Sequence, residues 1–394
     1  MTIDIKSKLG QFLMFLAESL DISDTRYEEA ESRYKAVGQW LGKEDAPLAQ
    51  FSPQIYPQGS FRLGTVIRPF DDREEYDIDL VCELQTSKDT MSQQQLKKIV
   101  GDRLKAHSDY VRMLDEEEGR RCWSLNYSDG AQFHMDILPA VPADEECNLL
   151  LAQYGVPIRL AEKAISITDT TAGNYSFIDN DWPRSNPKGY AEWFRERMQV
   201  RFENLRKSLA LSRRVATIEA VPEYQVKTPL QRAVQILKRH RDMKFLHDGD
   251  DKPVSIIITT LAAHAYDNEA DIVDCLLSLL EGMPRFIESR NGISWVPNPV
   301  NPMENFADKW HENPQRELKF RKWLRQVAED LKKALEEGNL AQLQELFRAR
   351  FGTRAVNEAL AKSERMMFGA VAVSRPTLPP RVEIHTPNKP WKDR

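Results

Sequence analysis

The chain lacks the features that mark secreted, membrane-spanning or zinc-binding proteins. Its four cysteines stand at positions 82, 122, 147 and 275, and none of them forms a CxxC pair. This scatter argues against a disulfide framework and against a zinc site. No apolar run reaches the ~18 residues of a membrane-spanning helix, and the first residues lack the apolar core of a signal peptide. We therefore expect a cytoplasmic protein with no membrane partner.

The sequence also lacks an excess of positive charge. It has 55 basic and 60 acidic side chains and a formal net charge of -5, so no overall basic field favours a long nucleic acid as partner. Two local basic clusters, residues 195–213 and 238–241, leave open whether they line a pocket or bind a nucleic-acid strand. The 394 residues are 41% apolar and 29% charged, which is typical of a soluble globular chain long enough for two lobes.

Two aspartates, Asp77 and Asp79, are separated by a single apolar residue. On a strand both carboxylates project from one face, while Tyr76, Ile78 and Leu80 project from the other. Carboxylates that share a site repel each other and raise a pKa, a cost that a divalent cation removes. Mg2+ prefers oxygen ligands and is often completed by the phosphates of a substrate. Taken alone, such a pair is more often a solvated strand end.

A third carboxylate, Asp136, stands in the apolar stretch 131–140. On a strand it shares a face with Gln132 and His134, and the turn 126–130 predicts a hairpin that leads into this strand. An unpaired charge in such a run is costly. We therefore predict that Asp136 completes a site for two metal ions, which in such enzymes lie about 3.5–4 Å apart. Asp136 would orient a hydroxyl or accept its proton, and His134 would be structural.

Before the paired aspartates, Gln58, Gly59 and Ser60 form a candidate phosphate-binding turn. Glycine lets the backbone approach a phosphate closely, and the following amides with the Ser60 hydroxyl can donate hydrogen bonds to phosphate oxygens. The alternative is an ordinary surface turn, since these residue types are common in turns.

The ordered series of Gly59-Ser60, Asp77, Asp79 and Asp136 resembles the active-site signature of the polymerase-beta-like nucleotidyltransferases. Within this superfamily, the amino-acid sequences of residues 56–65 and 75–82 resemble those of the bacterial CD-NTases. These enzymes make cyclic oligonucleotide second messengers in the anti-phage systems called CBASS. The resemblance implies an α+β fold with two lobes. A nucleotidyltransferase lobe with a mixed sheet would face a C-terminal helical lobe across a cleft that holds the active site.

The resemblance also assigns roles to two residues in the second half of the chain. Residues 228–242 have an amphipathic helical pattern, with Thr228 as cap and Pro229 as first residue. Lys238 on this helix matches the family's lysine that reaches the donor triphosphate, and Ser255 matches a serine that contacts the same group. Without the resemblance, Lys238 reads as a solvated helix residue and Ser255 as a helix cap.

We predict five segments along the chain. They are N-terminal helices (1–45) with a bracing helix that opens with a capping box at Thr25, the nucleotidyltransferase core (46–160), a lid or connector (161–227), a helical domain (228–371) and a proline-rich extended tail (372–394). Strands are expected near 60–68, 76–84, 121–127 and 131–138, and helices at 3–20, 91–106, 229–246, 254–266, 270–281, 313–337, 340–350 and 353–366.

The sequence therefore indicates a monomeric, Mg2+-dependent enzyme, with Mn2+ as the alternative ion, that binds nucleoside triphosphates such as ATP or GTP. The resemblance, and not the spacing of residues, supplies the cyclic product, most simply a cyclic dinucleotide, and a downstream effector that the diffusible product reaches. Two alternatives remain open at this point. One is a nucleotidyltransferase that makes a linear product or modifies a small molecule or protein, and the other is a catalytically silent module that binds a nucleotide or RNA.

Overall fold

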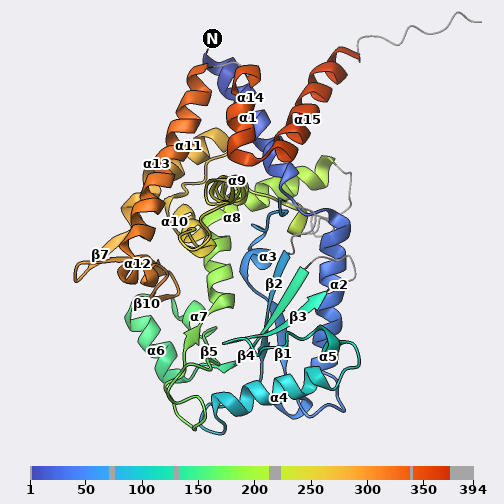
Figure 1. Ribbon diagram of the computed structural model, residues 1–394, viewed down its shortest axis with the longest axis vertical. Helices are drawn as coiled ribbons and strands as arrows, with labels where there is room; N and C mark the ends of the chain where they lie inside the picture. The colour runs from blue at the N-terminus through green and yellow to red at the C-terminus, as the bar shows by residue number, and fades with distance from the viewer. Residues whose placement is uncertain (1, 71–75, 128–132, 213–222, 338–339, 373–394) are drawn as a thin grey trace, which may run out of the picture.

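The computed structural model describes residues 2–70, 76–127, 133–212, 223–337 and 340–372. A mixed sheet with its own covering helices forms one end of the molecule, and a bundle of helices forms the other (Figure 1). Every helix among these residues is too short or too polar to cross a bilayer. The turn 128–130 and the tail 373–394, for which we predicted a hairpin turn and an extended chain, lie outside the described residues.

The sheet has six strands and both parallel and antiparallel pairs. The order along it is β1 (Gln54–Pro57), β2 (Tyr76–Glu83), β4 (Phe133–Pro142), β5 (Ile165–Ile167) and β6 (Arg184–Ser185), and β3 (Trp123–Tyr127) also pairs with β4. Strands β2 and β4 run parallel, and β3 and β4 form an antiparallel pair as the predicted hairpin requires. The expectation of an α+β fold with a mixed sheet is confirmed.

One face of the sheet is closed by helices. The alternate residues Ile78, Leu80, Met135 and Ile137 are at most 2% exposed and pack in one core with apolar residues of α2 and α4. The covering elements are α2 (Asp24–Leu41), η1 (Ala49–Phe51), α4 (Gln93–Lys105) and α5 (Tyr110–Met113). The opposite face of β2 and β4 therefore carries the polar side chains of these strands.

The helical end is built around α9 (Pro229–Lys244), which contacts four other helices of this end and α1 (Thr2–Ser19). The stripe of Leu230, Ala233, Val234 and Leu237 is fully buried, as its spacing predicts. Thr228 caps the helix in a capping box with Gln231. The helices around it are α10 (Ser255–Ala265), α11 (Ile272–Gly282), η4 (Met283–Phe286), α12 (Asp308–Glu312), α13 (Pro314–Glu337), α14 (Leu340–Phe351) and α15 (Thr353–Ala372).

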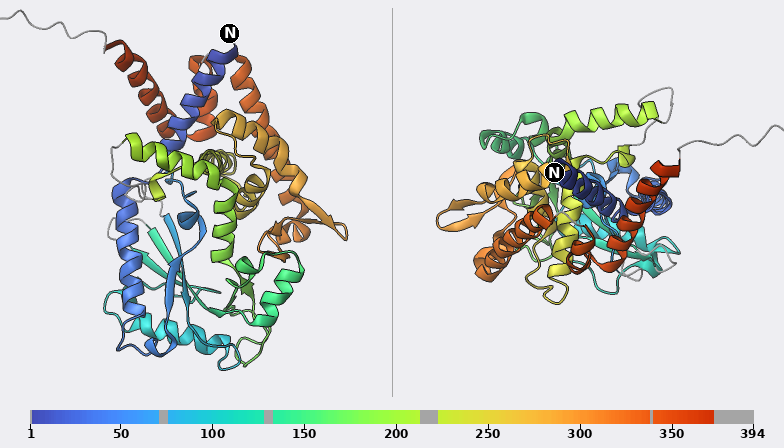
Figure 2. Two further views of the ribbon diagram at one scale, coloured as in Figure 1. Left: turned by 180° about the vertical axis from the view of Figure 1, so that it is seen from behind. Right: turned by 90° about the horizontal axis from the view of Figure 1, so that it is seen from above.

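One long helix, α8, joins the two ends. Helix α8 (Pro187–Ser212) contacts α3 (Gly59–Leu63) on one side and α10 on the other, and Figure 2 shows it beside both the sheet and the helices. The remaining elements are α6 (Glu145–Gln153), α7 (Ile158–Ala161), η3 (Glu223–Gln225) and four short strands, β7 (Glu288–Arg290), β8 (Ile293–Trp295), β9 (Pro297–Asn298) and β10 (Asn301–Asn305).

Two local predictions are wrong. The segment 60–68 is not a strand, because the glycine at position 59 turns the chain into α3, and the strand of this region is β1, before the turn. Helix α2 is not capped by Thr25, since the Ser23 side chain accepts the hydrogen bond from the Arg26 amide and the helix begins at Asp24. Both errors come from turn and cap geometry, which depends on single backbone angles that a residue pattern does not specify.

Candidate active site

The structure brings the three predicted aspartates to one face of the sheet. Asp79 and Asp136 are directly paired neighbours in the parallel register of β2 and β4, and Asp77 pairs with His134 two residues earlier on each strand. Asp79 and Asp136 are half-buried, whereas Asp77 is exposed. Because adjacent strands lie about 5 Å apart, the carboxylates of Asp79 and Asp136 share one small volume.

The carboxylates of this cluster repel one another. Burial, together with the charges of Asp136 and Asp77, raises the pKa of Asp79 to about 6, against the opposing effect of Lys238. Like charges are therefore held together by the fold against their repulsion, which is a common arrangement at functional sites.

Neighbouring side chains hold Asp136 and His134 in place. The Ser124 hydroxyl on β3 donates a hydrogen bond of 2.5 Å to Asp136 Oδ1. His134 Nδ1 is hydrogen-bonded to Asn126 Oδ1, and the Asn126 amide donates to Asp115. His134 thus has a side-chain partner away from Asp136, in agreement with the structural role expected for it.

The candidate phosphate-binding turn lies against the carboxylates. The backbone amide of Gln58 donates a hydrogen bond of 2.8 Å to the Asp79 backbone carbonyl. Gly59 follows with φ of +62° at the start of α3. A Cβ atom at position 59 would come within 2.2 Å of Asp79 Oδ2. Glycine is therefore required here for its backbone conformation and for the space that the carboxylate occupies. Ser60 follows in the first turn of α3 and is half-buried.

Lys238 approaches the same turn from α9. Its Nζ donates a hydrogen bond of 3.0 Å to the Thr65 carbonyl, and the side chain is 4% exposed. Burial and the nearby charge of Arg241 lower the pKa of Lys238 to about 7, against the opposing effect of Asp242 and Asp79. A lysine that gains a phosphate partner would recover its charge, because an anion favours the ammonium form.

Two glutamines of α9 on the same side of the helix as Lys238, Gln231 and Gln235, are also buried and hydrogen-bonded. Nε2 of the Gln231 side chain donates to the Leu63 carbonyl at 2.9 Å, and Nε2 of the Gln235 side chain donates to the Val66 carbonyl at 2.9 Å. Together with Lys238 these residues hold the chain that follows α3.

Ser255 is the first residue of α10 and is oriented by Arg241. Arg241 Nη1 donates hydrogen bonds to Ser255 Oγ at 2.8 Å and to the Pro253 carbonyl at 3.0 Å. The helix cap is Val254, so the Ser255 hydroxyl is not used as a cap. This bonding leaves the Ser255 hydroxyl proton available for an anionic ligand.

The two basic clusters are largely engaged within the protein. Within residues 238–241, Arg239 donates to the Arg68 carbonyl and His240 bonds Asp330 at 3.1 Å. Arg197 donates to the Ala263 and Tyr266 carbonyls at the end of α10. Arg197 thus satisfies carbonyl groups that the end of α10 leaves open.

A cavity of about 150 Å³ opens beside Gly59. We call it the hairpin cavity, because β9 and β10 form one wall; its lining includes Gln58, Gly59, Tyr190, Ile256, Asn298 and Glu304. It therefore lies between the phosphate-binding turn and the start of α10. No sequence pattern pointed to Asn298 or Glu304. They lie far from the motifs in the sequence, and only the fold brings their hairpin to this cavity.

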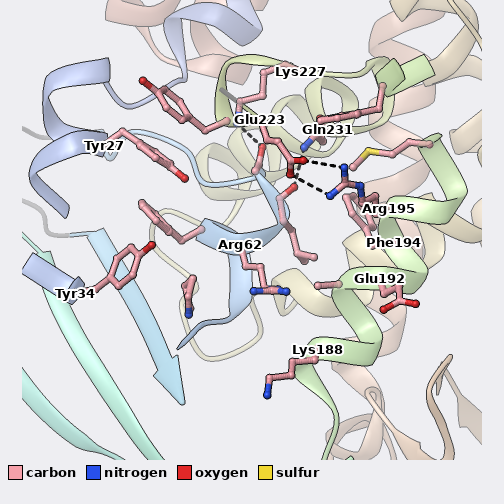
Figure 3. A pocket seen from close by; sticks show the side chains of 18 of the residues that line it. Tyr27, Tyr34, Arg62, Lys188, Glu192, Phe194, Arg195, Glu223, Lys227 and Gln231 are labelled. Carbon is pink, nitrogen blue, oxygen red and sulfur yellow. Dashed lines mark hydrogen bonds and ion pairs between the residues drawn. The ribbon is translucent and has the colours of Figure 1, made fainter. Parts of the chain in front are cut away.

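A larger cavity of about 490 Å³ lies on the other side of α3. This tyrosine cavity is lined among others by Tyr27, Tyr34, Phe61, Arg62, Lys188 and Tyr224. Tyr27 stacks between Phe61 and Tyr224 at 4.6 and 4.2 Å between ring centroids. Figure 3 shows the tyrosines of α2 on one side and Lys188, Glu192 and Arg195 of α8 on the other. Its volume is within the usual range of small-molecule sites, and the sequence analysis did not foresee it.

The residues present fit a divalent cation that a substrate helps to bind. Within the described parts of the chain, no three carboxylate, imidazole or thiolate groups lie close enough to enclose a metal by themselves. Asp79 and Asp136, with Asp77 nearby, bring carboxylates of like charge together. Mg2+ is typically held by one or two carboxylates together with substrate phosphates, and the turn at Gly59 is the place where such phosphates would arrive.

Comparison with known proteins gives consistent matches over most of the chain. A family model described as the Second Messenger Oligonucleotide or Dinucleotide Synthetase domain (SMODS) matches residues 7–197. A c-di-GMP synthase of Roseivirga ehrenbergii is 30% identical over 338 residues, which cover 84% of this chain and 82% of the relative. The cyclic dinucleotide synthase CdnG of Bradyrhizobium diazoefficiens is 25% identical over 389 residues, 93% of this chain and 86% of the relative.

Solved structures show the same fold. The structure of Bradyrhizobium diazoefficiens CdnG in complex with GTP aligns with a TM-score of 0.68 and 22% identity, covering 90% of this chain and 99% of that one. The Vibrio cholerae dinucleotide cyclase DncV in complex with GTP and 5MTHFGLU2 aligns with a TM-score of 0.53 and 17% identity, covering 91% and 88% of the two chains.

Proposed function

Because this chain belongs to the CD-NTase family of SMODS-domain second messenger synthetases, we propose that it is a Mg2+-dependent cyclic dinucleotide synthase whose reaction centre is formed by Asp77, Asp79 and Asp136. The observation that carries the assignment of the centre is the pairing of Asp79 with Asp136 across β2 and β4, directly against Gly59. Mn2+ is the alternative ion.

The triphosphate of the donor nucleotide would lie between the sheet and α9. Gly59 leaves room for the phosphates, and the hydroxyl of Ser60 and the amides at the start of α3 donate hydrogen bonds to them. Gln58 fixes the turn through its bond to the Asp79 carbonyl. Lys238 provides positive charge behind the turn, and Ser255 donates from the start of α10 in the orientation that Arg241 sets.

The chemistry is the attack of a ribose hydroxyl on the α-phosphorus of the donor, with pyrophosphate as the leaving group. Asp136, held by Ser124, orients this hydroxyl and accepts its proton. The divalent ions that Asp77, Asp79 and Asp136 would hold supply charge stabilisation for the phosphoryl group and the leaving oxygen. A second reaction between the two joined nucleotides closes the ring.

Two of the similar proteins point to GTP as a substrate of this chain. One relative is named as a c-di-GMP synthase, and CdnG was solved with GTP. We therefore propose a product that contains guanine and that acts on a downstream effector as a diffusible messenger, with the enzyme working as a monomer.

The product test uses the purified chain with Mg2+ and all four nucleoside triphosphates. We expect mass spectrometry to detect a cyclic dinucleotide containing guanine, and we expect this product to resist phosphatase because a ring has no terminal phosphate. A phosphatase-sensitive product would indicate a linear synthase instead. Mg2+-dependent nucleotide binding without pyrophosphate release would favour the silent binding module.

The role proposed for Lys238 predicts a change in substrate use. We expect Lys238→Gln to lower kcat/KM for GTP by about 10- to 100-fold, mainly through KM, because it removes a charged hydrogen bond to phosphate. In the wild type, kcat/KM should also fall as the pH rises above about 7, where Lys238 loses its proton. The variant should lack this alkaline decline.

Lys252→Gln is the matched control for this prediction. Lys252 is an exposed lysine that pairs with Asp242 at 3.0 Å, so its replacement should leave both KM and the pH profile close to those of the wild type. Equal KM values for the wild type and Lys238→Gln would remove Lys238 from the phosphate site.

A further inference from the structure

The wall of the hairpin cavity contains a side-chain amide with a fixed orientation. Asn298 is 5% exposed, and its Oδ1 accepts a hydrogen bond of 3.0 Å from the Val300 amide, which closes the turn between β9 and β10. Only the Nδ2 group then remains to donate, and it bonds Glu304 Oε2 at 2.8 Å. The hairpin backbone thus fixes the orientation of the Asn298 side chain, and the hydrogen bond from Asn298 in turn fixes the position of the Glu304 carboxylate.

Glu304 is an acid in a confined place. Burial raises its pKa, and the Asn298 bond and the charge of Arg121 only partly offset this effect. Glu304 lines the hairpin cavity together with Gln58, Gly59 and Ile256, the residue that follows Ser255. A half-buried acid that accepts a single hydrogen bond from the protein, among the contacts of the described residues, retains acceptor capacity for a ligand.

The position of this carboxylate relates it to the base of a nucleotide. The phosphates would occupy the Gly59 turn and Ser255, and the hairpin cavity extends from these two elements with Ile256 and Tyr190 as apolar and aromatic walls. Such walls fit a flat aromatic ring, because a base buries its faces against apolar groups and leaves its edge for hydrogen bonds.

The edge chemistry selects guanine. Guanine presents two adjacent donors, N1–H and the N2 amino group, and an ionised carboxylate has only acceptors, so one carboxylate can accept from both. Adenine presents N1 as an acceptor at the same place, which a carboxylate repels. We propose that Glu304, oriented by Asn298, reads the N1–N2 edge of a guanine base in the hairpin cavity and makes this synthase selective for GTP. This inference rests on the proposed function.

The experiment compares GTP with ITP, whose base lacks only the N2 amino group. The full-length chain with Mg2+ is assayed by pyrophosphate release as wild type, Glu304→Gln, Glu304→Asp and the control Glu312→Gln, which changes an exposed acid of α12. The measured quantity is the ratio of kcat/KM for GTP to that for ITP. This ratio does not depend on the fraction of folded enzyme, so a partly unfolded variant remains informative.

We expect the wild type, Glu304→Asp and Glu312→Gln to prefer GTP over ITP by about tenfold or more, as a paired polar contact implies. Glu304→Gln should reduce this preference to about unity and raise the use of ATP relative to GTP by about tenfold, since a glutamine amide can donate to adenine N1. A wild type without preference, or a Glu304→Gln variant with the wild-type preference, would overturn the inference.

A binding measurement separates this inference from the proposed function. Calorimetric titration with the α,β-methylene analogues of GTP and ITP reports base selection in the absence of turnover. A chain that binds the GTP analogue selectively through Glu304 but forms no cyclic product would contradict the proposed function and leave the reading of guanine intact. Equal affinities for the two analogues would reject the reading of guanine whatever product is made.

Discussion

Replacing Asp79 with asparagine is expected to lower pyrophosphate release by about 10³-fold or more. Asp79 is the central carboxylate of the site, directly paired with Asp136 and in contact range of Gly59. Its loss removes negative charge that a divalent cation requires, and the charge stabilisation of the phosphoryl group is lost with it. The measurement is the steady-state rate with GTP and saturating Mg2+.

The same substitution should stabilise the metal-free protein. The rise of the Asp79 pKa from its ordinary value to about 6 corresponds to about 3 kcal/mol of disfavour for the ionised form in the folded state. A raised carboxyl pKa contributes stability at low pH, and this contribution is lost as the pH rises from about 4 through about 6. Above pH 6, metal-free Asp79→Asn should therefore melt at a higher temperature than the wild type.

Magnesium distinguishes the two effects further. It should raise the melting temperature of the wild type above pH 6 and have a much smaller effect on Asp79→Asn, because the pair of like charges is gone. Asp250→Asn, in an exposed loop, serves as the control and should match the wild type in activity, stability and response to Mg2+. A variant that keeps its activity would remove Asp79 from the reaction centre, and one that loses stability together with activity would show that Asp79 has a structural role.

Gly59→Ala is expected to lower activity by about 100-fold. The added Cβ would stand 2.2 Å from Asp79 Oδ2, so either the turn or the carboxylate must move, and displacements of about 1 Å at a reaction centre cost about that factor. The φ of +62° adds strain of about 1–2 kcal/mol for a residue with a Cβ. Rates and chemical denaturation are both measured.

Gly155→Ala separates the clash from the strain. Gly155 has φ of +88°, but no atom lies within 4 Å of the position its Cβ would take. This variant should lose a similar amount of stability and keep its activity. If the two alanine variants have the same activity, close contact between the turn and the carboxylate is not required for the reaction.

The features of the site that could be predicted from sequence are those that depend on residues close together in the chain. The i, i+2 spacing of Asp77 and Asp79 placed them on one face of a strand, and the fold has them there. The stripe on α9 and its Thr228 cap were predicted correctly because helix periodicity and caps are local properties. The mixed sheet followed from the resemblance and not from propensity.

The parts that could not be predicted depend on contacts between distant segments. Residues 60–68 were predicted as a strand because their apolar content is compatible with one, yet Gly59 redirects the chain into α3. The cavity wall formed by Asn298 and Glu304 and the stack of Tyr27, Phe61 and Tyr224 bring together segments that are far apart in the sequence. The roles given to Ser60, Lys238 and Ser255 stay predictions until their variants are measured.

The segment from Gln58 to Arg68 is fastened at its two ends to different parts of the molecule. Its beginning is bonded to the Asp79 carbonyl of the sheet, and its end is bonded to Lys238 and Arg239 of α9. A rotation of the helical end relative to the sheet must therefore pull on this segment as a tether. Any molecule that shifts the helices would change the distance between bound phosphates and the carboxylates, and so would regulate the rate from afar.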